Sequence, residues 1–193
     1  MDGGDTTKII GISGSPRTNG NSEKLIDMTL DIAENRDFDA DRILLSKYSV
    51  APCTACGRCS DAKECAIKDD MTNLYPLLEA ADGIIVASPV YFGCVTAQLK
   101  ALFDRTLMLR RQGFLLSGKV GAAIAVGGSR NGGQEKTVQA IHDWMHIHGM
   151  IVVGDNSHFG GIVHAPAESD GAGIETVKAT IGKMCDVLRM LKR

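Results

Sequence analysis

The stretch Lys8–Ser22 reads KIIGISGSPRTNGNS, and it sets the fold class of the chain. Its first six residues form an apolar run that predicts a buried strand, and a glycine-rich turn follows. Beyond the turn, Ser22–Glu34 carries apolar residues at helical spacing and predicts an amphipathic helix. A buried strand, a glycine-rich turn and a helix in this order are typical of an α/β unit.

The same alternation of strand and helix continues along the chain. Four further strands are predicted at Arg42–Ser46, Gly83–Ser88, Lys119–Val126 and Met150–Val153. Four further helices are predicted at Met71–Ala81, Thr96–Arg110, Gln134–His148 and Ile174–Leu191. We therefore predict an α/β fold with a doubly wound, five-stranded parallel sheet and helices on both faces. The whole chain, 1–193, is expected to form a single domain. His158–Asp170 is the least regular stretch, and a role as an interface arm is open.

Composition narrows the function classes. Hydrophobic residues make up 44% and charged residues 23%, as in ordinary globular proteins. Lys and Arg number 21 against 23 Asp and Glu, so no excess charge points to nucleic acid or to a membrane surface. The start lacks the features of a secretory signal, and the longest near-apolar stretch, Gly83–Val95, is too short to span a bilayer. We expect a cytoplasmic protein without a nucleic-acid or membrane partner.

One glycine-rich loop, residues 13–22, follows the first predicted strand. Ligands of doubly wound sheets bind beyond the carboxyl ends of the strands. Hydroxyls, backbone N–H groups and a helix N-terminus combine here with the fixed charge of Arg17, which suits an anion. Gly14 and Gly20 fit neither a P-loop nor a dinucleotide fingerprint. A plain strand-to-helix turn is the alternative.

Two more loops leave the carboxyl ends of predicted strands. Ser88–Gly93 is a proline-fixed turn with two aromatic residues, which suits a planar ring. Taken alone, residues such as Tyr91 and Phe92 are more often ordinary core or helix-flanking residues. Gly127–Glu135 carries four glycines that let the backbone approach a ligand, and Arg130 would face its negative part. Alone, this loop is equally consistent with a flexible surface loop. Three such loops together are a more specific signal.

Four of the six cysteines gather on the irregular segment 50–70, inserted after the second strand. Their spacing suits four thiolates around one iron–sulfur cubane, although Ala66 and a longer last gap depart from the ferredoxin run C-x2-C-x2-C-x3-C-P. A structural zinc and a loop of free thiols stay open as alternatives, whereas cytoplasmic disulfides are rare. Cys94 and Cys185 are predicted to be small buried hydrophobes. The four candidate ligands are Cys53, Cys56, Cys59 and Cys65.

The three loops resemble those of the flavodoxin-like NAD(P)H:FMN reductase superfamily. With the cysteine loop included, the chain resembles the archaeal-type iron–sulfur flavoproteins. The similarity runs through GSPRTNGNS, ADGIIVASPVYFG and GGSRNGGQEKT and covers nearly the whole sequence. This resemblance implies a flavodoxin-like fold, FMN, a [4Fe–4S] cluster, a ferredoxin-like electron donor and assembly into a homodimer or homotetramer.

The resemblance also implies roles for individual residues. The residues expected to hold the FMN phosphate are Ser13, Ser15, Arg17, Asn21 and Ser22. Those expected to line the isoalloxazine ring are Pro89, Val90, Tyr91, Phe92 and Gly93. Those expected to close the pocket are Gly127, Gly128, Ser129 and Arg130.

No set of nucleophile, base and orienting residue stands out, so we expect cofactor chemistry without a catalytic side chain. The leading hypothesis is an oxidoreductase that passes single electrons from a ferredoxin-like donor through the cluster to FMN and on to a small-molecule acceptor. The runner-up is an NAD(P)H-dependent FMN or quinone reductase with a structural or vestigial cysteine loop. A third class is a flavodoxin-like carrier or redox sensor, against which the net charge of −2 argues mildly.

Overall fold

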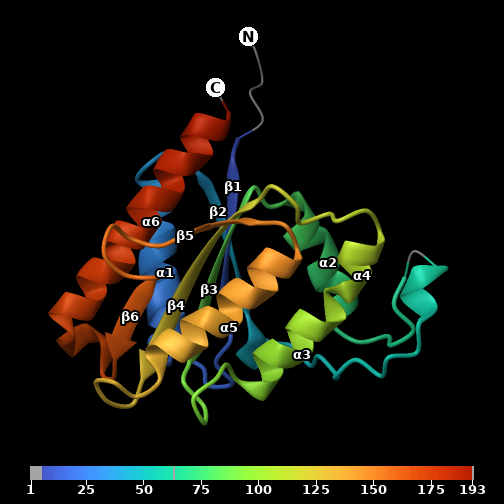
Figure 1. Ribbon diagram of the computed structural model, residues 1–193, viewed down its shortest axis with the longest axis horizontal. Helices are drawn as coiled ribbons and strands as arrows, with labels where there is room; N and C mark the ends of the chain where they lie inside the picture. Colours follow the sequence, from blue (N-terminus) through green and yellow to red (C-terminus); the bar gives the residue numbers. More distant parts are fainter. Residues whose placement is uncertain (1–5, 63, 193) are drawn as a thin grey trace.

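A computed structural model describes residues 6–62 and 64–192 and shows a central sheet between two layers of helices (Figure 1). The strand order is β2-β1-β3-β4-β5, and β6 also pairs with β4. The named strands pair in parallel throughout. The predicted doubly wound sheet of five parallel strands is therefore confirmed, with one short strand added.

The elements follow the predicted alternation with shifted ends. The strands are β1 (Lys8–Ser13), β2 (Asp39–Leu44), β3 (Gly83–Pro89), β4 (Val120–Gly127), β5 (Ile151–Val153) and β6 (Gly161–His164). The helices are α1 (Asn21–Glu34), α2 (Met71–Ala80), α3 (Ala97–Arg105), α4 (Leu107–Arg111), α5 (Gln134–Ile147) and α6 (Gly171–Leu191). The helix predicted over Thr96–Arg110 is divided at Thr106, whose hydroxyl donates to the Phe103 carbonyl at 2.6 Å. Such a bond competes with the regular helical pattern.

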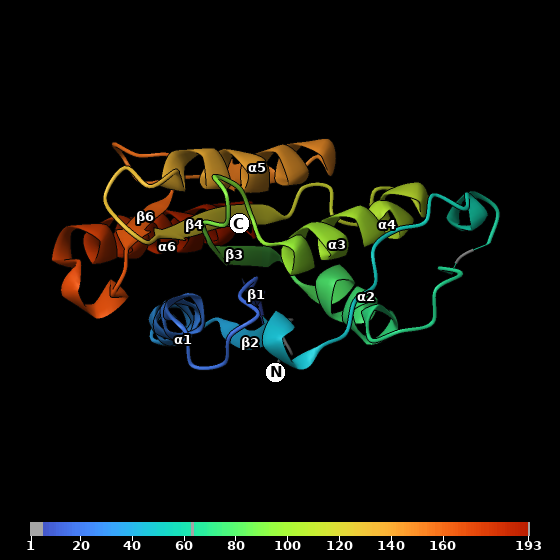
Figure 2. The same ribbon diagram turned by 90° about the horizontal axis from the view of Figure 1, so that it is seen from below.

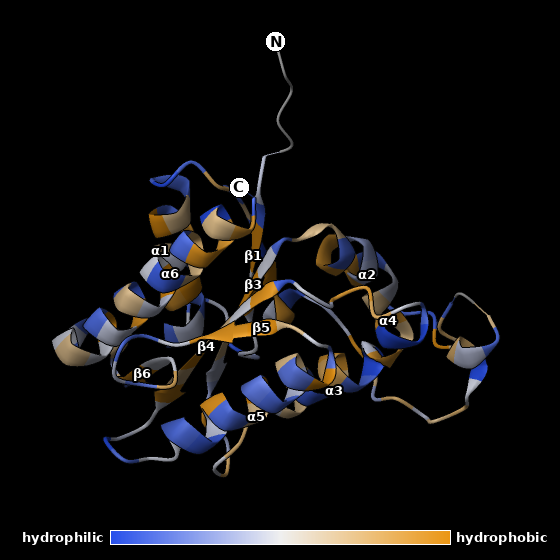
Figure 3. Cartoon of the chain, turned by 45° about the horizontal axis from the view of Figure 1, so that its top comes forward, coloured by the Kyte–Doolittle hydropathy of each residue, from blue (hydrophilic) through white to orange (hydrophobic). Residues whose placement is uncertain are grey.

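Both faces of the sheet are covered, which explains its near-continuous apolar strands. Successive residues point to opposite faces: Ile9 packs with residues of α1 and α6, and Ile10 packs with residues of α2, α3 and α5. Every residue of β4 is buried. Figure 2 shows the sheet between its two layers of helices, and Figure 3 shows largely hydrophobic strands beside helices that also carry hydrophilic residues. No helix in the described part of the chain is long and apolar enough to cross a membrane.

Strands β5 and β6 share one edge of β4. β5 pairs with the start of β4, and β6 pairs with its end. Between them the chain leaves the sheet and returns close to the backbone, so that a Cβ atom on Gly160 would collide with the Ala123 carbonyl. Part of the stretch predicted as irregular, and open to a role as an interface arm, is thus a strand of the sheet. The run GIVH was too short to reveal it.

The order of the strands fixes where ligands bind. Because β1 lies between β2 and β3, the chain reverses its direction of travel across the sheet at the β1–β3 boundary. Ser13 is paired with Ala87, and Pro89 with Val126, so the loops after β1, β3 and β4 leave the same edge. The cysteine loop lies apart from them, beside α3 and α4 at the periphery (Figure 2).

Candidate functional site

A cavity of about 200 Å³, here called the strand-end cavity, lies where the three loops meet. It unites nine of the fourteen residues predicted for FMN: Ser15, Arg17, Asn21, Ser22, Pro89, Val90, Tyr91, Gly127 and Gly128. Gly20, Val126 and Ala165 complete its lining, and none of the three was among the predicted FMN residues. Ala165 follows β6, and its N–H donates to the Gly127 carbonyl at 2.8 Å. Recognising that strand would have revealed this further loop at the same edge.

One end of the strand-end cavity combines groups whose chemistry suits an anion. Helix α1 begins at Asn21, and the N–H groups of a helix's first turn have no partners within the helix. The loop before it is held in shape by its own side chains. Ser15 Oγ accepts from the Arg17 N–H at 3.1 Å, and Glu23 Oε2 accepts from the Asn19 N–H at 3.0 Å. Arg17 is exposed at the mouth, so its charge is free to meet a phosphate.

The three loops are bonded to one another. Thr96 caps α3 by accepting from the Leu99 N–H at 3.1 Å, and its hydroxyl donates to the Gly14 carbonyl at 2.6 Å. The Val90 N–H donates to the Val126 carbonyl at 2.9 Å. The cradle therefore exists in the fold itself, which preorganises it for a ligand.

Three predicted residues from the first two loops lie away from the cavity. Ser13 is buried at the end of β1. Phe92 and Gly93 form a two-residue turn between Tyr91 and Cys94, with φ angles of 49° and 74°. These left-handed angles match a type I′ turn, and the Phe92 side chain projects fully into solvent. The sequence predicted that Phe92 would line the flavin ring. In the structure its side chain does not line the strand-end cavity.

The other two predicted residues, from the third loop, turn outward. Arg130 borders a separate cavity of about 280 Å³ with His164 and Asp170. The Ser129 carbonyl accepts from Gln134 Nε2 at 2.7 Å. Of the third loop, only its two leading glycines reach the strand-end cavity.

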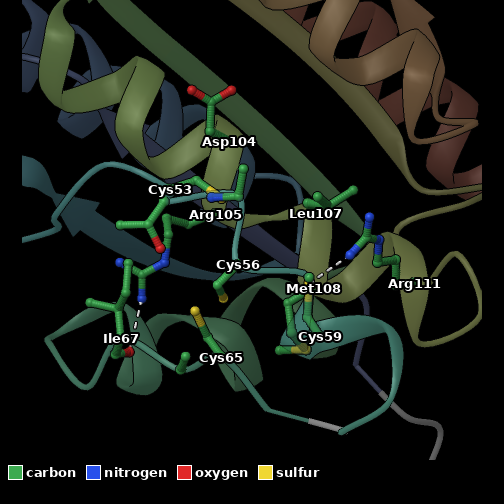
Figure 4. A pocket seen from close by; sticks show the side chains of 14 residues that line it. Cys53, Cys56, Cys59, Cys65, Ile67, Asp104, Arg105, Leu107, Met108 and Arg111 are labelled. Atoms are coloured by element: carbon green, nitrogen blue, oxygen red, sulfur yellow. Dashed lines mark hydrogen bonds between the residues drawn. The ribbon is translucent and has the colours of Figure 1, made fainter.

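All four predicted cysteine ligands line a second cavity of about 130 Å³, here called the cysteine cavity (Figure 4). Cys53 and Cys56 are exposed, whereas Cys59 and Cys65 are half-buried, and all four thiols are free. Two left-handed residues shape the loop: Ala55 has φ 53° and Gly57 has φ 77°. Such residues reverse the chain within each C-x2-C segment, which lets successive sulfurs face one space.

Helices α3 and α4 supply the floor of the cysteine cavity and donors to it. Arg111 Nη1 lies 3.4 Å from Cys59 Sγ and donates to it. The Ala55 N–H donates to Cys53 Sγ at 3.4 Å. Gln112 Nε2 donates to the Cys59 carbonyl at 3.2 Å. N–H donors and a cation beside thiolate sulfur tune and orient a sulfur-ligated metal group.

The donor set can be tested against the two kinds of metal group. A zinc ion with Zn–S bonds of about 2.3 Å would draw its four sulfurs into a tight tetrahedron. Within 6–62 and 64–192, no three His, Cys, Asp or Glu side chains are gathered that closely. Four thiols instead border one cavity. Soft thiolates around a space larger than one ion fit an iron–sulfur cluster.

A groove of about 650 Å³ runs between α3–α4 and α5 and adjoins the cysteine cavity. Cys53 of that cavity lines the groove, and so does Cys94, the last residue of the Tyr91–Cys94 turn. Cys94 is exposed, so the prediction of a buried residue is wrong there, whereas Cys185 is fully buried in α6 as predicted.

A buried polar network joins α3–α4 to α5 beneath this groove. Trp144 stacks on Phe103 with ring centroids 4.4 Å apart, and its Nε1–H donates to Thr106 Oγ1 at 2.9 Å. His148 Nε2 lies 2.9 Å from the same hydroxyl oxygen. Burial, aided by the charge of Arg110, lowers the pKa of His148 to about 4. His148 is therefore neutral near pH 7.

Residues 7–163 match the model of the NADPH-dependent FMN reductase family. The chain belongs to this family. Over 186 residues it is 61% identical to an iron–sulfur flavoprotein of Methanosarcina thermophila, a match that covers 96% of the chain and 97% of that protein. It is 45% identical to an iron–sulfur flavoprotein of Methanocaldococcus jannaschii, with 96% and 100% covered. A flavodoxin-like, WrbA-like protein from Agrobacterium tumefaciens shares the fold, with a TM-score of 0.69, 17% identity and coverage of 96% and 99%.

These relatives place the chain among the archaeal-type iron–sulfur flavoproteins of the FMN reductase family. The resemblance predicted from the sequence is thereby confirmed. So are FMN-dependent oxidoreductase chemistry and the pairing of FMN with an iron–sulfur cluster.

Proposed function

We propose that this chain passes single electrons from a ferredoxin-like donor through a [4Fe–4S] cluster to FMN and on to a small-molecule acceptor. The observation that supports this path is the division of the candidate ligands between two cavities. The four thiols line one, the predicted FMN residues line the other, and the described linings share no residue. A cluster carries one electron at a time and FMN one or two, so a protein with both joins single-electron donors to two-electron acceptors.

The residues of the strand-end cavity would bind FMN by backbone and charge. Ser15, Arg17 and the first N–H groups of α1 would hold the phosphate. Val90 and Tyr91 would lie against the ring, and Gly127 lets the backbone approach it. Cys53, Cys56, Cys59 and Cys65 would ligate the cluster.

Access supports a protein as the electron donor. Cys53 and Cys56 are exposed, so the cluster site opens to the surface, where a ferredoxin-like protein would dock. Cys53 also lines the groove that reaches Cys94, at the end of the Tyr91–Cys94 turn. A homodimer or homotetramer in the cytoplasm belongs to the same proposal. It is supported by exposed apolar side chains such as Phe92, Phe159 and Ile147.

The Cys65→Ser variant tests this function. Its hydroxyl stays protonated near neutral pH and replaces a thiolate poorly, so the variant is expected to lose acid-labile sulfide and the broad visible absorption of the cluster. FMN is expected to remain bound, and reduction of FMN by reduced ferredoxin to become much slower. The measurements are iron, sulfide and flavin analysis with anaerobic stopped-flow spectroscopy. Stoichiometric zinc without sulfide in the parent protein would contradict the proposal.

Direct reduction by NAD(P)H is the second candidate, favoured by the match to the NADPH-dependent FMN reductase family. The same stopped-flow experiment separates the two. Rapid bleaching of the flavin by NADPH, equal in the parent and in Cys65→Ser, would favour a hydride-accepting reductase in which the cysteine loop is structural.

A further inference from the structure

Arg105, the last residue of α3, has the largest fully buried side chain in the described chain, although it carries a charge. Its Nη1 donates to the Ala51 carbonyl at 2.9 Å and to Asp69 Oδ2 at 2.7 Å. Its Nη2 donates to the Ile67 carbonyl at 3.1 Å and to Asp69 Oδ1 at 2.9 Å. The guanidinium therefore binds one carboxylate and two backbone carbonyls at once. Figure 4 shows its bond to the Ile67 carbonyl.

The two carbonyls belong to the two ends of the cysteine loop. Ala51 stands two residues before Cys53, and Ile67 stands two residues after Cys65. Asp69 closes the same neck from its other side, because its Oδ2 also accepts from the Ala51 N–H at 2.8 Å. Arg105 and Asp69 thus join the segment that leads into the cysteine loop to the segment that leads out of it, at the base of all four cysteines.

A buried ion pair is poor evidence for a gain in stability. Desolvation of the two charges offsets much of their attraction, and apolar residues of similar size often stabilise a fold more. Arg105 Nε finds no hydrogen-bond partner among residues 6–62 and 64–192, which adds to the cost. The informative feature of the pair is its place. It makes its contacts to loop backbone on an otherwise irregular segment of the chain.

We propose that Arg105 and Asp69 form a clasp that closes the neck of the cysteine loop before any metal is bound. The inference rests on the proposed ligand set, the four cysteines of the loop. An open loop would have to be ordered when iron arrives, and the lost conformational freedom would weaken binding. A closed neck presents the four thiols together. Arg105 is thus a positioning residue, which acts through the backbone of the loop.

Co²⁺ is the probe for this clasp. Binding of one ion requires the four thiols to move together from their positions around the cavity, which a closed neck favours, and thiolate-to-cobalt absorption reports that binding without any cluster or activity. In metal-free, anaerobic protein, Arg105→Lys is expected to weaken Co²⁺ binding about tenfold or more, because lysine keeps the charge but lacks the planar fork. Arg36→Lys is the matched control. Arg36 Nη1 also donates to a carbonyl, of Gly182, and to a carboxylate, of Asp186, but it joins α1 to α6. Its Co²⁺ affinity is expected to stay within about twofold of the parent.

Separate readouts test the clasp and the four-cysteine ligand set. FMN affinity checks the fold of each variant, since the strand-end cavity is lined by other residues. Parent-like Co²⁺ affinity in Arg105→Lys would overturn the clasp. An unchanged Co²⁺ spectrum in Cys65→Ser would instead overturn the four-cysteine ligand set.

The parent protein alone gives a second test if Arg105→Lys does not fold. The Ala51 N–H donates to Asp69 within the clasp. It is therefore expected to exchange slowly with deuterium in metal-free protein. Exchange at the rate of an unstructured peptide would show that the neck is open without metal and would overturn the inference.

Discussion

The strand-end cavity and the cysteine cavity are built in opposite ways. The first consists of loops whose spacing is set by the parallel register of β1, β3 and β4, and its anchors are buried backbone bonds such as that from Val90 to Val126. The second lies on an irregular segment that is held by side chains, chiefly Arg105, Asp69 and Gln112. One site inherits its geometry from the sheet, and the other depends on a few polar contacts.

This difference predicts different responses to change. A site set by sheet register loses only part of its affinity when a single side chain at its edge is removed, because the backbone cradle persists. A site held by side chains depends on the elements that carry them. For the cysteine cavity these are α3 and α4, so whatever loosens α3 and α4 is expected to disturb the cysteine cavity before the strand-end cavity.

Lowering the pH is expected to give the largest effect, because it weakens the packing of α3–α4 against α5. The pKa of His148 is about 4 in the folded protein, against about 6.5 in an unfolded chain. The folded state thus binds fewer protons between these values, and stability is fully present above pH 6.5 and falls as the pH drops toward 4. Between pH 7 and pH 5 the expected loss is ~2 kcal/mol of unfolding free energy. Denaturant unfolding at several pH values measures it.

The His148→Gln variant is the control for this pH dependence. Its amide N–H can replace the contact to Thr106 but does not titrate, so the slope between pH 7 and pH 5 is expected to flatten. The pKa of His142 is also lowered, mainly by burial, and leaves a smaller slope of the same sign. Parallel curves for parent and variant would mean that folding does not lower the pKa of His148.

The same contrast explains what could be predicted from the sequence. The strands, and with them the strand-end cavity, follow from apolar runs such as GIIVAS and from glycine-rich turns, because the register of a buried sheet leaves few alternatives. The direction of the Phe92 side chain could not be predicted, because a ring-lining and a solvent-facing aromatic look alike in sequence. Its direction depends on a left-handed φ of 49° at the turn.

For the cysteine loop, the sequence revealed less of what determines the geometry. Its candidate ligands were visible in the spacing of the cysteines, but the residues that hold the loop were not. Asp69 was explicable as a helix-flanking acid, and Arg105 as an ordinary charged residue of an amphipathic helix. Their pairing joins positions 36 residues apart in the chain, and no local pattern reports such a contact.

Arg17→Ala tests the predicted phosphate contact at the strand-end cavity. Removing a charge-assisted contact to phosphate is expected to cost ~1.5–3 kcal/mol, which weakens FMN binding about tenfold or more. The N-terminus of α1 and the loop hydroxyls remain, so binding is expected to weaken without being abolished. Fluorescence titration of flavin-free protein measures the affinity. Co²⁺ binding at the cysteine cavity should match the parent, and unchanged FMN affinity would show that the phosphate is held elsewhere.

Arg111 offers the smallest and most specific change, the counterpart of Arg17 at the other site. Its guanidinium donates to Cys59 Sγ at 3.4 Å, but the residue is exposed, so solvent screens its charge. Replacing it by Met removes a positive charge that favours the more negative, reduced cluster, and the cluster potential is expected to fall. An exposed charge contributes ~0.2–1 kcal/mol, which for one electron corresponds to a shift on the order of 10–40 mV.

Potentiometric titration of the parent and Arg111→Met measures the shift, and Arg111→Lys, which keeps the charge, should restore most of it. A potential lowered equally in both variants would assign the effect to the geometry of the guanidinium rather than to its charge. In each variant FMN affinity should equal that of the parent, because Arg111 does not line the strand-end cavity.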